Sequence, residues 1–85
     1  MKLDIISPEE IVYSGEVDLV TLPGTLGSFT IFPNHAPIIS SLEKGRLRYM
    51  KEGKEVEMII NGGFVEMKNN IVNVCIEQVL KLTDE

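Results

Sequence analysis

Few side chains in this sequence could carry out nucleophilic or metal chemistry. The chain has one histidine, His35, and one cysteine, Cys75, so a metal site built from several histidines cannot form within it. A Cys–His pair can be imagined between them, but Cys75 stands in a valine-rich stretch expected opposite Phe64, where a thiol acts as a small apolar side chain. Ser28 and Ser40 could be nucleophiles, yet neither lies in a nucleophile-elbow motif.

The acidic residues do not suggest a catalytic pair either. The closest pairs are Glu9 with Glu10 and Glu55 with Glu57, and both are more simply solvent-exposed residues of turns or strand edges. A glycosidase needs two carboxylates facing each other across a cleft, for which a chain of 85 residues has little room. The glycine-containing segment 23–27 lacks the Lys-Ser/Thr ending and the helix of a phosphate-binding loop. We therefore predict that the chain is not an enzyme and has no catalytic, metal or cofactor site.

Length, charge and cysteine content limit which kinds of protein and partner remain possible. Eighty-five residues predict a single domain over residues 1–85, with disorder confined to residues 83–85. The formal net charge of −5 argues against nucleic acid as a partner and against binding to an anionic membrane surface. No apolar run is long enough to span a bilayer, so direct membrane insertion is not expected. A single cysteine cannot form an internal disulfide and favours a reducing compartment.

Apolar and polar residues alternate along most of the chain, as they do in half-buried β-strands. Leu3 and Ile5 share one face of an opening strand, which the break at Pro8 ends. Short strands at intervals of roughly 8–12 residues predict an all-β fold, either a two-layer β-sandwich or a flattened barrel of short, mostly antiparallel strands. The segment 76–82 is compatible with a last strand or with a helical turn.

Two hairpins with readable registers are predicted in the second half of the chain. A two-residue turn at Glu52 and Gly53 sets Tyr49 opposite Val56, Leu47 opposite Met58 and, on the other face, Arg48 opposite the oppositely charged Glu57. A longer turn with Gly53 in the left-handed region would shift this register by one residue. A second turn at Asn69 and Asn70, which tolerate positive φ, sets Met67 opposite Val72, Val65 opposite Val74 and Phe64 opposite Cys75. Between the hairpins, Gly62 and Gly63 indicate a bulge, a sharp bend or a close backbone approach.

An irregular segment, residues 23–37, precedes the hairpins and is predicted to be a structured surface loop around one brief strand. It carries His35, whose ring could either bond to the local backbone or contact a partner, since binding residues concentrate on loops held by a rigid scaffold. Four apolar residues on this loop and its exit could be either core residues or a docking patch: Leu26, Phe29, Ile38 and Ile39.

Several motifs follow one another along the chain in a recognisable order. They are Leu3–Glu9, Tyr13–Gly15, the run Leu22-Pro23-Gly24-Thr25-Leu26-Gly27, the run Ile31-Phe32-Pro33-Asn34-His35-Ala36-Pro37-Ile38-Ile39, Lys44-Gly45, Gly62-Gly63-Phe64-Val65-Glu66 and Asn70–Val74. In order and spacing, this set resembles the β-sandwich domain of the epsilon subunits of F-type ATP synthases. The resemblance extends from residue 1 to about residue 80, and the Pro-x-His-Ala-Pro loop with Gly-Gly-Phe-Val-Glu downstream is its most specific part.

The resemblance implies a sandwich of two five-stranded sheets on the rotor stalk of a proton- or sodium-driven ATP synthase. In that family the domain links the gamma subunit to the ring of c subunits, the c-ring, and helps couple ion translocation to ATP synthesis. Carried over by position, the c-ring side would comprise Gly24, Thr25, Leu26, Gly27, Ser28, Phe29 and Thr30. The gamma side would comprise Ser7, His35, Ile38 and Ser40. The implied location is the cytoplasmic face of the bacterial inner membrane, as a peripheral part of the complex, with no small-molecule substrate.

The sequence departs from the family pattern at a few positions. Ser28 stands where some relatives have an acidic residue that contacts the ring, so this contact would lack a charge. Thr30 and Asn34 replace common glycines; Thr30 must then be extended, whereas Asn34 can still adopt a positive φ. Many bacterial epsilon subunits continue with a helical hairpin that can bind ATP and inhibit hydrolysis. Residues 1–85 do not include it, so neither property is expected of them.

An alternative of a different class is a small β-sandwich that binds a ligand or a carbohydrate. Such a module would present exposed aromatic side chains as a flat binding platform. This chain has no Trp, two Tyr and three Phe, and most of these aromatic residues stand at predicted core positions. The connector between gamma and the c-ring is therefore the favoured hypothesis.

Overall fold

The computed structural model describes residues 1–84, without the side chain of Asp84, and its regular elements are all β-strands. They are β1 (Lys2–Ile6), β2 (Ile11–Glu16), β3 (Leu19–Gly24), β4 (Gly27–Ile31), β5 (Ile38–Lys51), β6 (Lys54–Lys68), β7 (Ile71–Ile76) and β8 (Val79–Asp84). The tail after residue 76 therefore forms a strand and not a helical turn. The predicted disorder is wrong for Thr83 and Asp84, which belong to β8, and for Glu85 it lies outside the described residues.

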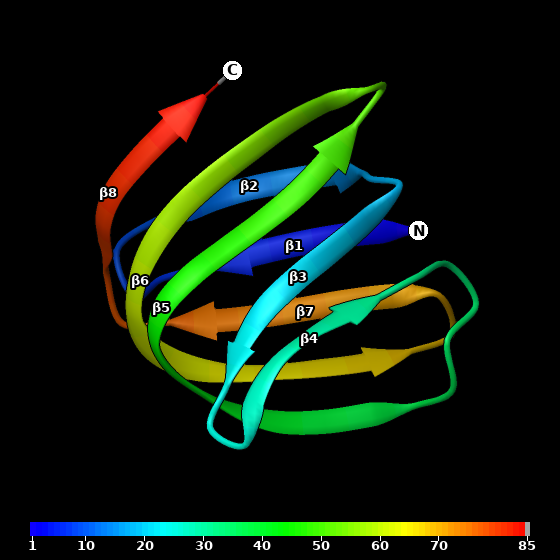
Figure 1. The fold of residues 1–85 in the computed structure, drawn as a ribbon, viewed down its shortest axis with the longest axis horizontal. Helices are drawn as coiled ribbons and strands as arrows, with labels where there is room; N and C mark the ends of the chain where they lie inside the picture. Colours follow the sequence, from blue (N-terminus) through cyan, green and yellow to red (C-terminus); the bar gives the residue numbers. More distant parts are fainter. Residues whose placement is uncertain (85) are drawn as a thin grey trace.

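The strands form two layers. The two longest strands, β5 and β6, take part in both, because each passes from one layer into the other (Figure 1). The first layer has the order β2-β1-β7-β6-β5 and uses the second half of β6 and the start of β5. The second layer has the order β4-β3-β5-β6-β8 and uses the first half of β6 and the remainder of β5. Within residues 1–84, β1 and β7 run parallel and the other neighbouring strands run antiparallel. The predicted β-sandwich of mostly antiparallel strands is confirmed.

The passage of β6 between the layers takes place at Gly62 and Gly63, which have φ of 122° and 146°. Residues with a Cβ rarely adopt this part of conformational space. At Gly63 an added Cβ would also collide with the backbone carbonyl of Cys75 on β7. The two glycines thus provide both a sharp bend and a close backbone approach, as the sequence indicates.

Both predicted hairpin registers are confirmed. In the first hairpin Tyr49 pairs with Val56 and Leu47 with Met58; in the second, Met67 pairs with Val72, Val65 with Val74 and Phe64 with Cys75. Each turn has positive φ at both central residues, 51° and 77° at Glu52 and Gly53, and 54° and 61° at Asn69 and Asn70. This is the signature of a two-residue type I′ turn, whose twist matches that of the strands it joins. The longer first turn is therefore excluded.

The charged residues on the first hairpin pair differently from the prediction. Arg48 does lie opposite Glu57 in the register, but its guanidinium is 3.7 Å from the carboxylate of Glu55, and Arg46 is 3.5 Å from Glu57. Long side chains reach their diagonal neighbours on the same face of a twisted sheet, which explains the exchange of partners. Both pairs are partly exposed, so each contributes less than about 1 kcal/mol.

Residues 23–37 are more regular than the predicted loop. β3 continues through Pro23 and Gly24 into a tight hairpin with β4, in which Pro23 pairs with Ser28 and Gly24 with Gly27. The loop prediction is therefore wrong for Pro23, Gly24, Gly27 and Ser28, whereas the brief strand predicted within the segment is present as β4. The register between β3 and β5 shifts between Thr21 and Gly24. Pro23 is tolerated there because the N–H that proline lacks would not belong to a regular ladder of backbone hydrogen bonds. Residues 32–37 do form a loop.

The core lies between the two layers, and among the side chains of residues 1–83 it buries no polar or charged one. Leu3 and Ile5 face it from β1, as predicted. Its large, fully buried members come from alternate positions along the strands: Leu3, Ile5, Val20, Leu22, Ile31, Leu47, Met58, Ile60, Val65, Met67, Val72 and Val74. Because alternate residues of a strand point to opposite faces, this pattern also decides which side chains each layer presents to the outside.

Candidate partner-binding surface

The outer face of the first layer carries a continuous row of apolar side chains. Backbone pairing places Ile11 next to Ile6, Ile6 next to Cys75, and Cys75 next to Phe64. Ile11 is 68% exposed, Phe64 52% and Ile6 40%, and Cys75 is partly exposed. We call these four residues the apolar row. Contiguous exposed apolar surface is typical of a site of contact with another protein.

Hydrogen bonds connect the apolar row to the tip of the β3–β4 hairpin. Phe64 pairs with Ser41 of β5, and Ser41 in turn contacts Thr25 at the tip. The backbone N–H of Thr25 donates to the carbonyl of Ser41 at 3.1 Å, and the two hydroxyl oxygens lie 2.8 Å apart. Leu26, the next residue of the tip, is fully exposed. The tip is thus held at a fixed position at the end of the row.

A shallow cleft of about 320 Å³ lies beside the row, lined in part by Ile6, Phe64 and Ser7. Ser7 follows β1 and closes a turn with Glu10: its backbone N–H donates to the Glu10 carbonyl at 2.9 Å, and its hydroxyl donates to the same oxygen at 3.3 Å. Ser7 is therefore an anchored residue at the edge of the apolar row.

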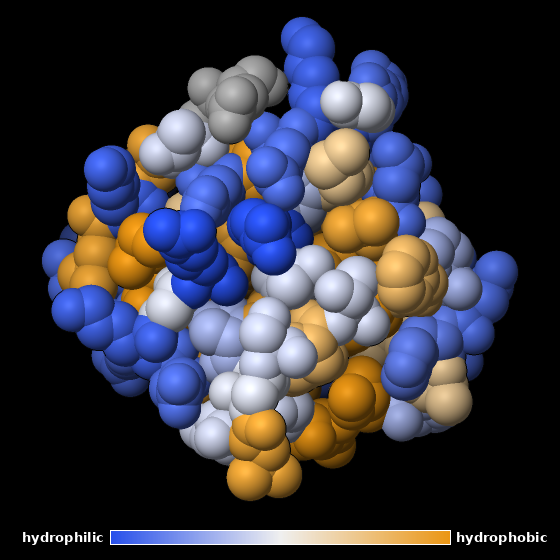
Figure 2. All heavy atoms as spheres, in the orientation of Figure 1, coloured by the Kyte–Doolittle hydropathy of each residue, from blue (hydrophilic) through white to orange (hydrophobic). Residues whose placement is uncertain are grey.

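The outer face of the second layer is polar by contrast. It carries the two diagonal Arg–Glu pairs of the β5–β6 hairpin and, on the neighbouring strands, Thr21 and Thr30, whose hydroxyl oxygens lie 2.8 Å apart. Thr30 is extended in β4, as expected for a residue that replaces glycine. Figure 2 shows this side of the molecule, with hydrophilic and neutral side chains over its centre. The two outer faces therefore differ in character, and the apolar one is suited to a partner.

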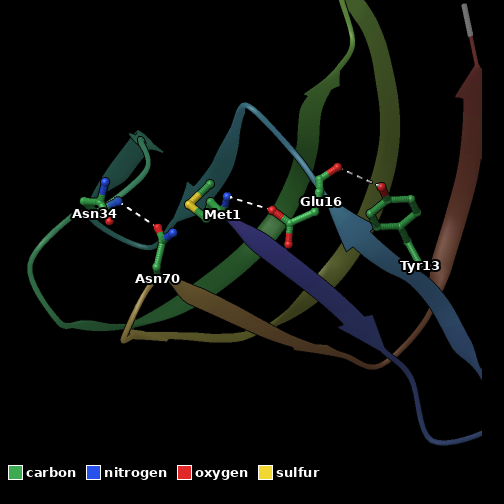
Figure 3. A network of polar contacts seen from close by, with 5 residues as sticks. All are labelled: Met1, Tyr13, Glu16, Asn34 and Asn70. Atoms are coloured by element: carbon green, nitrogen blue, oxygen red, sulfur yellow. Dashed lines mark hydrogen bonds and ion pairs between the residues drawn. The ribbon is translucent and has the colours of Figure 1, made fainter.

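His35 lies on the loop between β4 and β5, away from the apolar row. Its Nδ1 atom is 2.7 Å from the Ala36 carbonyl, and its backbone N–H donates to Phe32 at 3.2 Å, so the ring does bond to the local backbone. The preceding residue, Asn34, has a φ of 63°, and its N–H donates to the side-chain oxygen of Asn70 at 2.8 Å, which ties the loop to the β6–β7 turn (Figure 3). His35 and Ser7 are thus at opposite ends of the first layer.

The other residues predicted on the gamma side occupy the start of β5. Ile38 is partly buried against the core, and Ser40 is half-buried, with its hydroxyl donating to the carbonyl of Ser41 at 3.0 Å. Ile39, between them, is 75% exposed. Leu26, Phe29, Ile38 and Ile39 could be core residues or a docking patch on the sequence alone, and the structure separates them. Phe29 and Ile38 contact the core, whereas Leu26 and Ile39 face the outside.

The residues predicted on the c-ring side form the β3–β4 hairpin tip and the strand that follows it. Gly24 is buried, residues 25–28 are exposed, and Phe29 and Thr30 are half-buried. Gly27 closes the tip with a φ of 130° and open space around it, so its role is conformational. The tip thus presents Leu26 and Ser28 to the outside without a charged side chain.

Sequence reasoning missed the apolar row. The predicted pairing of Phe64 with Cys75 is confirmed, but most aromatic residues are expected at core positions, and the structure turns Phe64 outward. Phe32, at 56% exposed, is also no core residue. The alternating pattern of the strands could have predicted this arrangement. Val65 and Val74 are buried, so the residues next to them in the strands, Phe64 and Cys75, must face the opposite side.

The residues considered for nucleophilic chemistry are not brought together. His35 is next to Asn34, which contacts Asn70, and Cys75 lies five residues further along β7, about 16 Å in an extended strand. Among the side chains that the structure describes, those of residues 1–83, no cluster of three His, Cys, Asp or Glu could hold a metal ion. The described part of the chain also has no helix long and apolar enough to cross a bilayer.

Fold and surface together define a small two-layer β-sandwich with one outer face suited to protein contacts. The chain belongs to the family described as the ATP synthase Delta/Epsilon chain, beta-sandwich domain, whose sequence model matches residues 1–81. It is 45% identical over 74 residues to the ATP synthase epsilon chain of Leptospira interrogans, covering 87% of this chain and 58% of that one. It is 46% identical over 74 residues to the epsilon chain of Carboxydothermus hydrogenoformans, covering 87% of this chain and 55% of the relative. The chain thus spans a little more than half the length of these relatives.

Two solved structures share the fold. A chain of the Euglena gracilis mitochondrial ATP synthase, in a structure of OSCP, F1 and c-ring, matches 93% of this chain and 51% of its own length, with a TM-score of 0.87 and 21% identity. A chain of the Tetrahymena thermophila mitochondrial ATP synthase, in a structure of the central stalk and c-ring, matches 94% of this chain and 65% of its own length, with a TM-score of 0.80 and 13% identity. At such identities the likeness concerns the fold alone.

Proposed function

We propose that this chain is the β-sandwich part of an epsilon subunit that connects the gamma subunit to the c-ring in a rotary ATP synthase. It would do so as one domain, residues 1–85, without a catalytic site of its own. Membership of the Delta/Epsilon family supports the proposal, as do curated relatives named ATP synthase epsilon chain. The observation that carries it is the apolar row, which ends at an exposed hairpin tip.

In this proposal the gamma subunit binds the outer face of the first layer. Phe64 and Ile6 would supply apolar contact, with Ser7 at one edge. Ile39 would extend the contact along β5, and His35 would follow at the far end of the layer. Ser40 and Ile38 alternate with Ile39 and point to the inner side, so they would reach gamma only at the edge of the layer that β5 forms. Burial of the exposed apolar row would drive association.

The c-ring would bind the β3–β4 hairpin, residues Gly24–Thr30, with Leu26 as its most prominent contact. Two hydrogen bonds between Thr25 and Ser41 hold the tip against the layer that would bind gamma. A connector that transmits torque must not bend between its two contacts. The short turns and the apolar core suit that requirement, because a close-packed interior resists deformation.

The proposed setting is a proton- or sodium-driven enzyme that makes ATP. The chain would sit in a peripheral position on the cytoplasmic face of a bacterial inner membrane and would bind neither nucleic acid nor a small-molecule substrate. A carbohydrate-binding module is less well supported. Phe32 and Phe64 are exposed at different places on the surface, and Tyr13 and Tyr49 stack on each other instead of presenting a shared platform.

Replacing Leu26 with aspartate tests the assignment of the hairpin tip. We expect binding to detergent-solubilised c-rings to weaken about tenfold or more, because an unpaired carboxylate would be buried at the contact. Binding to the gamma subunit should stay unchanged. Co-sedimentation with c-rings and calorimetry with gamma would measure the two effects.

The matched control is Leu80→Asp, a change at an exposed leucine of β8, which should affect neither partner. If Leu26→Asp left binding to the c-ring unaltered, the tip would not be the ring contact.

A further inference from the structure

A second cleft, separate from the apolar row, opens between the two layers at the end that carries the β5–β6 turn. Its volume is about 450 Å³, and it is lined by Tyr13, Tyr49, Lys51, Glu52, Lys54 and Val56. Tyr13 belongs to the first layer, through β2, and the other lining residues belong to the second layer or its turn. The cleft is thus the open mouth of the sandwich.

Two lysines lie side by side on the second-layer edge of this mouth. Lys51 and Lys54 are directly paired in the register, on either side of the two-residue turn. They share the inward side of their strands with Tyr49 and Val56, so they prolong the core-facing rows out to the rim. Like charges placed directly opposite each other destabilise a hairpin. None of the ion pairs formed among the described side chains, residues 1–83, includes either lysine.

The tyrosines give the mouth a firm wall. The rings of Tyr13 and Tyr49 are 4.4 Å apart between centroids, with an interplanar angle of 30°. The Tyr13 hydroxyl donates to the backbone carbonyl of Glu16 at 3.3 Å, which holds the ring in place (Figure 3). The Lys51 ammonium lies 5.7 Å from the centre of the Tyr13 ring, so its charge is already positioned over the cleft. The acidic residue Glu52 also lines the cleft from the turn.

We propose that this cleft binds a phosphate group, held between the ammonium groups of Lys51 and Lys54 against the tyrosine wall. A phosphate group carries close to two negative charges at neutral pH and accepts hydrogen bonds on several oxygens. It can therefore bond to both ammonium groups at once, as lysines that bind phosphate do in other proteins. Binding would also remove the repulsion between the two lysines. The proposal does not depend on the function proposed above.

The phosphate group could belong to free inorganic phosphates or to a nucleotide, and the probes separate these sources. The isotope-labelled chain would be titrated with pyrophosphate and, in parallel, with ADP at constant ionic strength, while amide NMR signals are followed. We expect saturable shifts at Tyr13 and residues 49–56 with both probes. Equal affinity would indicate that phosphate alone is recognised, and an affinity for ADP about threefold higher would indicate that the nucleoside part adds contacts of its own.

Charge variants decide whether these lysines form the site. Lys51→Gln combined with Lys54→Gln should weaken pyrophosphate binding about tenfold or more, and Glu52→Gln should tighten it about threefold. The control is Lys2→Gln combined with Lys68→Gln, because these two lysines flank Ile71 on neighbouring strands and line no part of this cleft. Absence of saturable shifts, or equal weakening in the control, would overturn the proposal. Amide NMR spectra of the variants without ligand would verify that each variant is folded.

Discussion

Replacing Phe64 with aspartate is expected to weaken binding to the gamma subunit about a hundredfold or more, while the domain remains folded. Phe64 is 52% exposed and lies within the apolar row, next to Cys75 and close to the cleft beside Ser7. Aromatic residues near the centre of an interface often account for much of the binding energy. A carboxylate at this position would have to be buried without a partner charge. Calorimetric titration with gamma would measure the loss.

The fold should tolerate this change because the Phe64 side chain points away from the core. The matched control is Leu82→Asp, which alters a leucine that is 60% exposed on β8, outside the apolar row. We expect this control to bind gamma like the unaltered chain. If Phe64→Asp bound gamma with unchanged affinity, the outer face of the first layer would not be the gamma contact.

Replacing Leu47 with alanine is expected to lower the free energy of unfolding by about 3 kcal/mol, the second large effect. Leu47 is fully buried in β5, opposite Met58, where β5 faces the core between the layers. A chain of this size has a total stability of about 4–13 kcal/mol, so the loss would be a substantial fraction of it. Urea denaturation followed by circular dichroism would show a lower midpoint with an unchanged slope.

The control for this prediction is Ile39→Ala in the same strand. Ile39 is 75% exposed, so its truncation should change stability by no more than about 0.5 kcal/mol. Equal losses for the two variants would contradict the assignment of core and surface along β5.

The hairpins were the most predictable part of the fold, for a physical reason. Glu52-Gly53 and Asn69-Asn70 are short turns that need positive φ at both residues, and a slip of one residue would expose Leu47 and bury its polar neighbours. Turn chemistry and alternation therefore point to the same register. Gly62 and Gly63 were predictable as a bulge, a bend or a close approach, because paired glycines inside a strand pattern indicate backbone that side chains disfavour; both have positive φ here, and at Gly63 a Cβ would also collide with β7.

Other features depend on contacts between segments that are far apart in the sequence. Pro23 suggested a loop, but it is accommodated at the register shift between β3 and β5, which local sequence does not reveal. The diagonal ion pairs of Arg46 and Arg48 depend on how the sheet twists. The apolar row needs β1, β6 and β7 side by side, and the parallel pairing of β1 with β7 cannot be seen in either strand alone.

The candidate site was accessible from the sequence mainly through resemblance to a family. That resemblance named Gly24–Thr30 and, on the gamma side, Ser7, His35, Ile38 and Ser40. The structure places the first set on the β3–β4 hairpin, Ser7 after β1, and the other three residues along β5 and the loop before it. Their roles as partner contacts remain predictions. Ile39 and Phe64, which the structure exposes, add to them.

The most direct test of the proposed function asks whether this chain bridges its two partners. C-rings would be immobilised in detergent, and retention of gamma would be measured with and without the chain. We predict that gamma is retained when the unaltered chain is present, that Phe64→Asp binds the ring without retaining gamma, and that Leu26→Asp is itself not retained. Retention of gamma that did not depend on the chain, or a chain that bound neither partner, would contradict the proposal.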